Sequence, residues 1–80
     1  MRAELTVYVR QDCHLCADML QVLEELKPEL GFSYRACDVD DDAVLAARYG
    51  ARVPVLVGGS TELCCYFLDV RRLREYLRSS

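Results

Sequence analysis

The sequence lacks long apolar segments, an excess of positive charge and a second histidine besides His14. A membrane-spanning helix needs about 18 or more consecutive apolar residues, and no stretch approaches that length. The first ten residues include Glu4 and Arg10 and have no apolar run typical of a secretory signal, so we expect neither membrane insertion nor export. The 10 basic residues are outnumbered by 13 acidic ones, and we therefore expect no nucleic-acid partner.

A resident metal or cofactor is not indicated either. The acidic segment 38–42 lacks the glycine and glutamate spacing of a calcium-binding loop, and we interpret its aspartates as helix N-caps. A zinc site built from one chain would require a second closely spaced cysteine pair or another histidine. We expect no bound cofactor, apart from glutathione as a possible co-substrate.

Five cysteines are present, an odd number that does not suit a closed disulfide framework. Without an export signal, this favours a reducing cytoplasm. Cys13 and Cys16 form a C-x-x-C pair between an apolar segment and a helix-like one. Two such thiols can close a small disulfide ring or share a metal. A helix N-terminus at Cys13 favours its thiolate, whereas Asp12 opposes it, and we expect a modestly lowered pKa for Cys13.

The hydrophobic pattern predicts a single α/β domain over residues 1–80, in the order β-α-β-α-β-β-α. Pro28 is expected to end the first helix near Lys27. Pro54 is expected at the start of the third strand, and Gly58–Gly59 in the hairpin turn. The strands are predicted over residues 5–9, 32–37, 53–57 and 63–67, and the helices over 14–27, 43–49 and from 70 onward.

Three features resemble the small glutaredoxin-like proteins of the thioredoxin-fold superfamily over residues 5–77. They are the Cys13–Cys16 motif after the first strand, Val53-Pro54 before the third strand, and the β-β-α ending. The resemblance implies a four-stranded mixed sheet in the order 2-1-3-4, with the second helix on the face opposite the other two. It also implies a cis peptide bond at Val53–Pro54, facing the active cysteines.

The resemblance further implies a thiol–disulfide oxidoreductase in which Cys13 is the nucleophile and the more buried Cys16 resolves the mixed disulfide. Val53, Pro54 and Arg10 are then the predicted substrate-binding residues. A protein disulfide or a small thiol is the expected substrate, a cellular reductant regenerates the dithiol, and the chain is expected to be a monomer. Cys64 and Cys65 stand where glutaredoxins have Gly-Gly, so we expect weaker glutathione binding than in that class.

Two other functions remain open at this point. The same two cysteines could hold a metal or an iron–sulfur cluster between two chains, or the domain could be a binding module whose C-x-x-C pair is not used. Cys37 alternates with its strand neighbours and is predicted to be a buried small side chain. Adjacent residues of a strand point to opposite faces, so Cys64 and Cys65 are predicted not to share a ligand.

Overall fold

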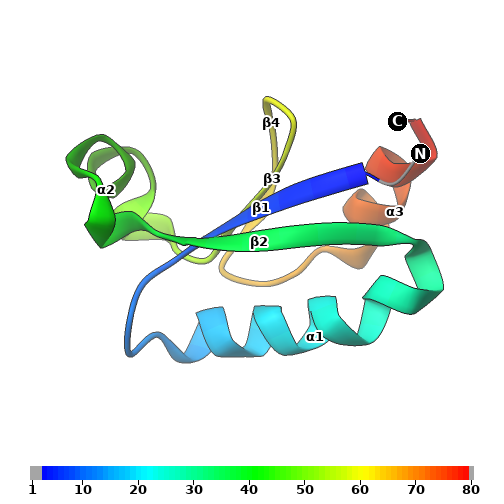
Figure 1. The fold of residues 1–80 in the computed structure, drawn as a ribbon, viewed down its shortest axis with the longest axis horizontal. Helices are drawn as coiled ribbons and strands as arrows, with labels where there is room; N and C mark the ends of the chain where they lie inside the picture. Colours follow the sequence, from blue (N-terminus) through cyan, green and yellow to red (C-terminus); the bar gives the residue numbers. More distant parts are fainter. Residues whose placement is uncertain (1–2, 80) are drawn as a thin grey trace.

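The computed structural model of the protein describes residues 3–79 and has the predicted order of elements (Figure 1). Two single-turn 3-10 helices, η1 and η2, flank the second α-helix. No helix within the described residues is both long enough and apolar enough to cross a membrane. The elements are β1 (Ala3–Val9), α1 (His14–Leu30), β2 (Phe32–Asp38), η1 (Val39–Asp41), α2 (Ala43–Tyr49), η2 (Gly50–Arg52), β3 (Val55–Gly58), β4 (Thr61–Cys65) and α3 (Val70–Ser79).

The four strands form one mixed sheet in the order β2-β1-β3-β4, which confirms the expected order. β1 and β2 are parallel, with Val9 opposite Asp38 at their carboxyl ends. β3 is antiparallel to both β1 and β4. The parallel pair requires a crossover, which α1 supplies, whereas β3 and β4 are joined by a tight turn. Consequently the β1–α1 junction, η1 and the start of β3 all lie at the same end of the sheet.

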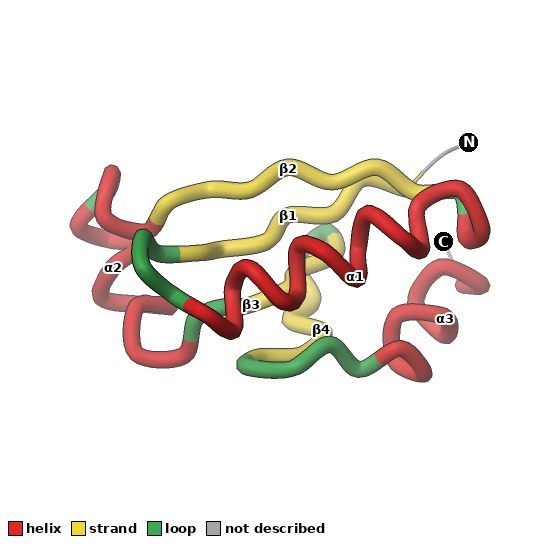
Figure 2. The backbone as a smooth tube through the Cα atoms, turned by 90° about the horizontal axis from the view of Figure 1, so that it is seen from below, coloured by secondary structure: helices red, strands yellow, loops and turns green. Residues whose placement is uncertain are grey.

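Each face of the sheet has its own buried cluster because strand side chains alternate between faces. Leu5 and Val7 of β1 belong to a cluster completed mainly by α1 and α3, including Leu23 and Leu73. Val55 of β3 belongs to the other cluster, with Val39 and Tyr49 from η1 and α2. Helix α2 therefore lies on the face opposite α1 and α3, as expected. In Figure 2, which views the molecule from below, α1 crosses in front of the sheet and α2 lies at one end of the strands.

The first helix is longer than predicted, because it continues through Pro28 to Leu30. Proline has no N–H, so the helix loses one backbone hydrogen bond at this point. Leu26 and Leu30 pack against the larger core on either side of Pro28. Gly31, with φ 71°, then ends the helix in the left-handed conformation, and its N–H donates to the Lys27 carbonyl at 2.9 Å. Packing and this cap together outweigh the local preference against proline.

The hairpin differs from the prediction in its strand boundaries and in the position of its turn. β3 begins at Val55 rather than Val53, and β4 covers Thr61–Cys65 rather than residues 63–67. Gly58 is the last residue of β3, paired with Thr61, so the turn itself is Gly59–Ser60. A bulge shifts the register between Leu56 and Val57.

Candidate active site

Cys13 and Cys16 form a disulfide at the N-terminus of α1. Cys13 is the N-cap residue in an extended conformation, and its Sγ accepts a hydrogen bond of 3.1 Å from the backbone N–H of Cys16. The Cα atoms are 5.2 Å apart, within the range of about 4.4–6.8 Å that suits a disulfide. Cys16 is 3% exposed and Cys13 is half-buried, which confirms the expected order of burial.

An open groove of about 500 Å³ adjoins the disulfide. Both cysteines line it, together with Arg10, Asp12 and His14. Asp12 has φ 57°, a left-handed conformation that aspartate tolerates better than most residues. The groove therefore exposes Cys13 and contains one acidic and one basic side chain close to it in sequence.

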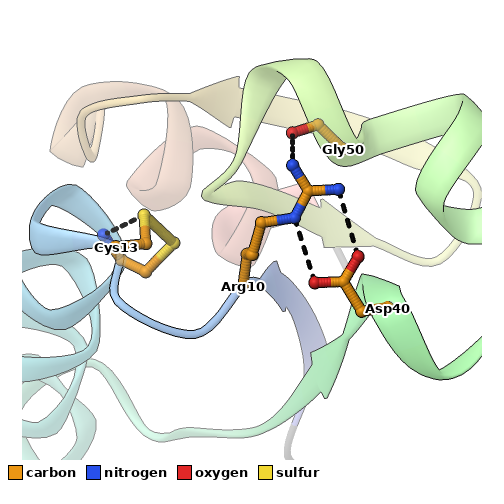
Figure 3. Close-up of a disulfide and its surroundings, with 5 residues drawn as sticks. Arg10, Cys13, Asp40 and Gly50 are labelled. Atoms are coloured by element: carbon orange, nitrogen blue, oxygen red, sulfur yellow. Dashed lines mark hydrogen bonds and ion pairs between the residues drawn. A yellow bond between two sulfur atoms is a disulfide. The ribbon is translucent and has the colours of Figure 1, made fainter.

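Arg10 is held on one side of this groove by two distant segments (Figure 3). Its Nε and Nη2 donate to the two carboxylate oxygens of Asp40, at 3.1 and 3.2 Å. Its Nη1 donates to the carbonyl oxygen of Gly50 at 3.2 Å. Asp40 belongs to η1, and Gly50 begins η2, which leads to Val53. Arg10 thus joins the loop before Cys13 to the segments that precede and follow α2.

Val53 and Pro54, the other two predicted substrate-binding residues, do not line the groove that Arg10 lines. The Val53–Pro54 peptide bond is cis, the geometry that the resemblance implied. The Pro54 side chain is fully buried, and its carbonyl accepts a 2.9 Å hydrogen bond from the Tyr66 N–H. Val53 packs against the smaller core cluster. The groove is lined by Arg10, Cys13 and Cys16, and neither Val53 nor Pro54 is among its lining residues.

The three remaining cysteines lie outside this groove. Cys37 is half-buried rather than buried, since β2 is an edge strand. Cys64 packs on the larger cluster and Cys65 on the smaller one, which confirms that their side chains point to opposite faces. Burial raises the pKa of the Cys64 thiol above its ordinary value, and a hydrogen bond to the Asp69 backbone partly opposes that rise. Within residues 3–79, no three His, Cys, Asp or Glu side chains form a group that could hold a metal ion.

Sequence reasoning did not find the residues that hold Arg10. Asp40 and Gly50 lie 30 and 40 positions away, and Asp40 was interpreted only as part of a capping segment. The parallel register could have indicated the contact, because pairing Val9 with Asp38 brings the residues that follow each strand close together. A second groove of about 360 Å³ was also missed, where the exposed Phe67 adjoins the N-terminal half of α1.

Comparisons with known proteins agree with this arrangement. An uncharacterized protein of Mycobacterium tuberculosis is 33% identical over 84 residues, which cover 99% of this chain and 87% of that protein. A solution structure of a protein from Nitrosomonas europaea has a TM-score of 0.86 at 36% identity, covering 95% of this chain and 92% of that one. A crystal structure of a protein from X. campestris has a TM-score of 0.74 at 36% identity, covering 95% and 97%.

The fold extends to more distant proteins. Thioredoxin 1 from Thermosipho africanus has a TM-score of 0.64 at only 14% identity, covering 95% of this chain and 96% of that one, which shows a shared thioredoxin fold. The family model described as Glutaredoxin-like domain (DUF836) matches residues 4–78. Because this match covers nearly the whole chain, and the paired cysteines and the mixed sheet agree with it, the chain belongs to the glutaredoxin-like domain (DUF836) family.

Proposed function

We propose that this chain is a thiol–disulfide oxidoreductase in which Cys13 is the nucleophile and Cys16 the resolving cysteine. The observation that carries the proposal is the Cys13–Cys16 disulfide at the N-cap of α1, with Cys13 the more accessible of the two. A helix N-terminus places backbone N–H groups and positive dipole charge beside the first sulfur, which favours its thiolate. The glutaredoxin-like family and the thioredoxin fold support a redox function of this type.

The proposed reaction begins with the reduced dithiol. The Cys13 thiolate attacks one sulfur of a substrate disulfide, the substrate S–S bond breaks, and the departing thiolate takes up a proton from water. Cys16 then loses its proton and attacks Cys13 Sγ, which breaks the mixed disulfide and releases the second substrate thiol. The substrate has gained two electrons and two protons, and the protein is left with the Cys13–Cys16 disulfide. The Cys16 N–H that now contacts Cys13 Sγ at 3.1 Å can donate to the Cys13 thiolate in the reduced form.

The proposed substrate is a protein disulfide or a small disulfide, and a cellular thiol reductant restores the dithiol. We propose that the chain acts as a monomer in the cytoplasm, with Arg10 and the Val53–Pro54 segment contacting the substrate. Glutathione is proposed as a weaker co-substrate than in ordinary glutaredoxins. Two features support this: Cys64 and Cys65 carry side chains where glutaredoxins have glycine, and the Arg10 donors already bind Asp40 and Gly50.

A single-turnover experiment tests the proposal. The fully reduced protein is freed of reductant and mixed with an excess of bis(2-hydroxyethyl) disulfide, and Cys13–Cys16 disulfide formation is followed by mass spectrometry. We expect the wild type to form this intramolecular disulfide, Cys16→Ser to stop at a mixed disulfide on Cys13, and Cys13→Ser to do neither. Cys37→Ser is the matched control, because it removes a half-buried thiol outside the groove and should behave as wild type. Consumption of bis(2-hydroxyethyl) disulfide is followed in parallel, and consumption by Cys13→Ser at the wild-type rate would refute the assignment of Cys13 as the nucleophile.

A further inference from the structure

We propose that the groove beside Cys13 discriminates substrates by charge, disfavouring disulfides with negatively charged groups next to the reacting sulfurs and favouring neutral or positively charged ones. This inference rests on the proposed oxidoreductase function, and it names the substrate class of the same site. Asp12 and Asp40 are the residues that set the preference, Asp12 by its own charge and Asp40 by neutralising Arg10.

Arg10 is the residue that would attract an anionic substrate, because it carries the guanidinium that lines the groove, where the other nitrogen base is the imidazole of His14. All three guanidinium nitrogens are already engaged, two by the Asp40 carboxylate and one by the Gly50 carbonyl. The Arg10–Asp40 pair therefore has no net charge. In Figure 3 the Arg10 side chain points toward Asp40 and Gly50 rather than toward the disulfide. A substrate carboxylate would have to displace Asp40 or bind to a pair that is already neutral.

The contact with Gly50 fixes this orientation of Arg10. A Cβ atom at position 50 would lie 2.7 Å from Arg10 Nη2, closer than Cβ atoms approach other heavy atoms in proteins, so in this position the guanidinium occupies space that a glycine leaves free. The Asp40 carboxylate engages the guanidinium through both of its oxygens, which is the geometry that Arg–carboxylate pairs favour. Arg10 is thus held by two segments at once.

Asp12 adds an uncompensated negative charge to the same groove. It immediately precedes Cys13 and lines the groove, and among the described residues its carboxylate has neither an ion pair nor a hydrogen bond. The N-terminus of α1 opposes it with a partial charge of roughly half a unit, which is smaller than the full charge of a carboxylate. One N–H of that terminus already donates to Cys13 Sγ. The carboxylate of Asp12 and the partial charge of the helix N-terminus therefore sum to a net negative charge beside Cys13.

The test uses three small disulfides that differ in charge: cystamine (positive), bis(2-hydroxyethyl) disulfide (neutral) and 3,3′-dithiodipropionate (negative). The second-order rate constant for oxidation of the reduced protein by each disulfide is measured at low ionic strength. Each value is divided by the rate constant for dithiothreitol with the same disulfide, which removes differences in intrinsic reactivity. We expect the normalised rate constants to fall from cystamine through the neutral disulfide to dithiodipropionate, and the differences to shrink at high salt.

Two variants test the named residues. Asp12→Asn and Asp40→Asn should each lower the ratio of the cystamine rate to the dithiodipropionate rate about two- to fivefold, the range expected for one partly exposed charge interaction. The ratio is insensitive to changes in the reactivity of Cys13, because those affect both disulfides equally. Asp41→Asn is the matched control: Asp41 is an exposed neighbour in η1 without a bond to Arg10, so the same loss of charge should leave the ratio unchanged.

The outcomes separate this inference from the proposed function. If none of the three disulfides oxidises the reduced protein to the Cys13–Cys16 form, the oxidoreductase function itself is wrong. If all three react with equal normalised rates, or if Asp12→Asn and Asp40→Asn leave the ratio unchanged, the function stands and charge selection is refuted. If Asp40→Asn and Asp41→Asn lower the ratio of the cystamine rate to the dithiodipropionate rate equally, the specific role of the Arg10–Asp40 pair is refuted.

Discussion

Replacing Gly50 with alanine should have opposite effects on stability depending on whether Arg10 is present. The Gly50 backbone has φ −53° and ψ −34°, a helical conformation that alanine adopts without strain. Its added Cβ, however, would lie 2.7 Å from Arg10 Nη2 and 3.5 Å from Arg10 Cζ. The guanidinium must then move away, which weakens its bonds to the Gly50 carbonyl and to Asp40.

The magnitudes follow from these two opposing effects. Gly→Ala at an unstrained position stabilises a protein by about 0.4–1 kcal/mol, because the unfolded chain loses conformational freedom. The side chains of Arg10 and Asp40 are 41% and 54% accessible. Because solvent screens their charges, losing the hydrogen bonds of Arg10 should cost about 1–2 kcal/mol of stability, less than the loss of a buried ion pair would cost. Gly50→Ala should therefore destabilise the wild type by about 0.8 kcal/mol at the midpoints of these two ranges.

A double-mutant cycle measures the coupling between these positions. Urea unfolding is followed by far-UV circular dichroism in wild type, Gly50→Ala, Arg10→Ala and the double variant, all with the Cys13–Cys16 disulfide closed. In the Arg10→Ala background the obstruction is gone, and Gly50→Ala should stabilise by about 0.4–1 kcal/mol. The coupling free energy should thus be about 1–2 kcal/mol. The same change in unfolding free energy in both backgrounds would refute the close packing of Arg10 on Gly50.

Three further predictions concern the packing around the sheet. Alkylation of Cys64 by iodoacetamide, resolved by peptide mass spectrometry, should reach half its maximal rate above pH 9.0, because burial raises its pKa; saturation below that pH would contradict this. Burial and the hydrogen bond to Glu24 raise the pKa of Tyr34 to about 12 from an ordinary 10.0, so Tyr34 adds stability that is fully present below pH 10 and lost as the pH rises through 12. A difference titration against Tyr34→Phe should show this pKa, and Glu24→Gln should bring it back toward 10.0; a Tyr34 titration near 10.0 in the wild type would be inconsistent with the contact. Leu23→Ala, at a fully buried position, should cost about 2–5 kcal/mol, whereas Val44→Ala, 70% exposed, should change stability by less than about 0.5 kcal/mol; equal effects would contradict the assigned core.

Interactions between residues close in sequence were predictable because their geometry depends on the backbone they share. Two aspartates of the acidic segment 38–42 cap helices as expected: Asp38 accepts a hydrogen bond from the N–H of Asp40, and Asp42 accepts one from the N–H of Val44. Asp69 likewise accepts one from the N–H of Arg72 at the start of α3.

The proximity of the paired cysteines was predictable for the same reason. Residues three positions apart at the start of a helix lie on the same side of it, one turn apart, so their spacing allowed a disulfide between Cys13 and Cys16, whereas the greater burial of Cys16 was implied by the family resemblance.

Element boundaries and registers were less predictable, because they depend on contacts with distant segments. Pro28 stays inside α1 since Leu26 and Leu30 pack on the core and Gly31 caps the helix. The register of the hairpin depends on a bulge opposite Leu56 and Val57, which nothing in the local pattern of alternation indicates.

The order of the elements, the helix caps and the position of the cysteine pair could be inferred from the amino-acid sequence, since each depends on residues a few positions apart. The surroundings of that pair depend on long-range contacts of the folded chain. The parallel pairing of β1 with β2 brings Asp40 to Arg10, and the close approach at Gly50 completes the contact. Arg10 could be recognised as a basic residue near Cys13, but whether its charge remains available to a substrate depends on partners 30 and 40 positions away, which only the folded chain brings within hydrogen-bonding distance.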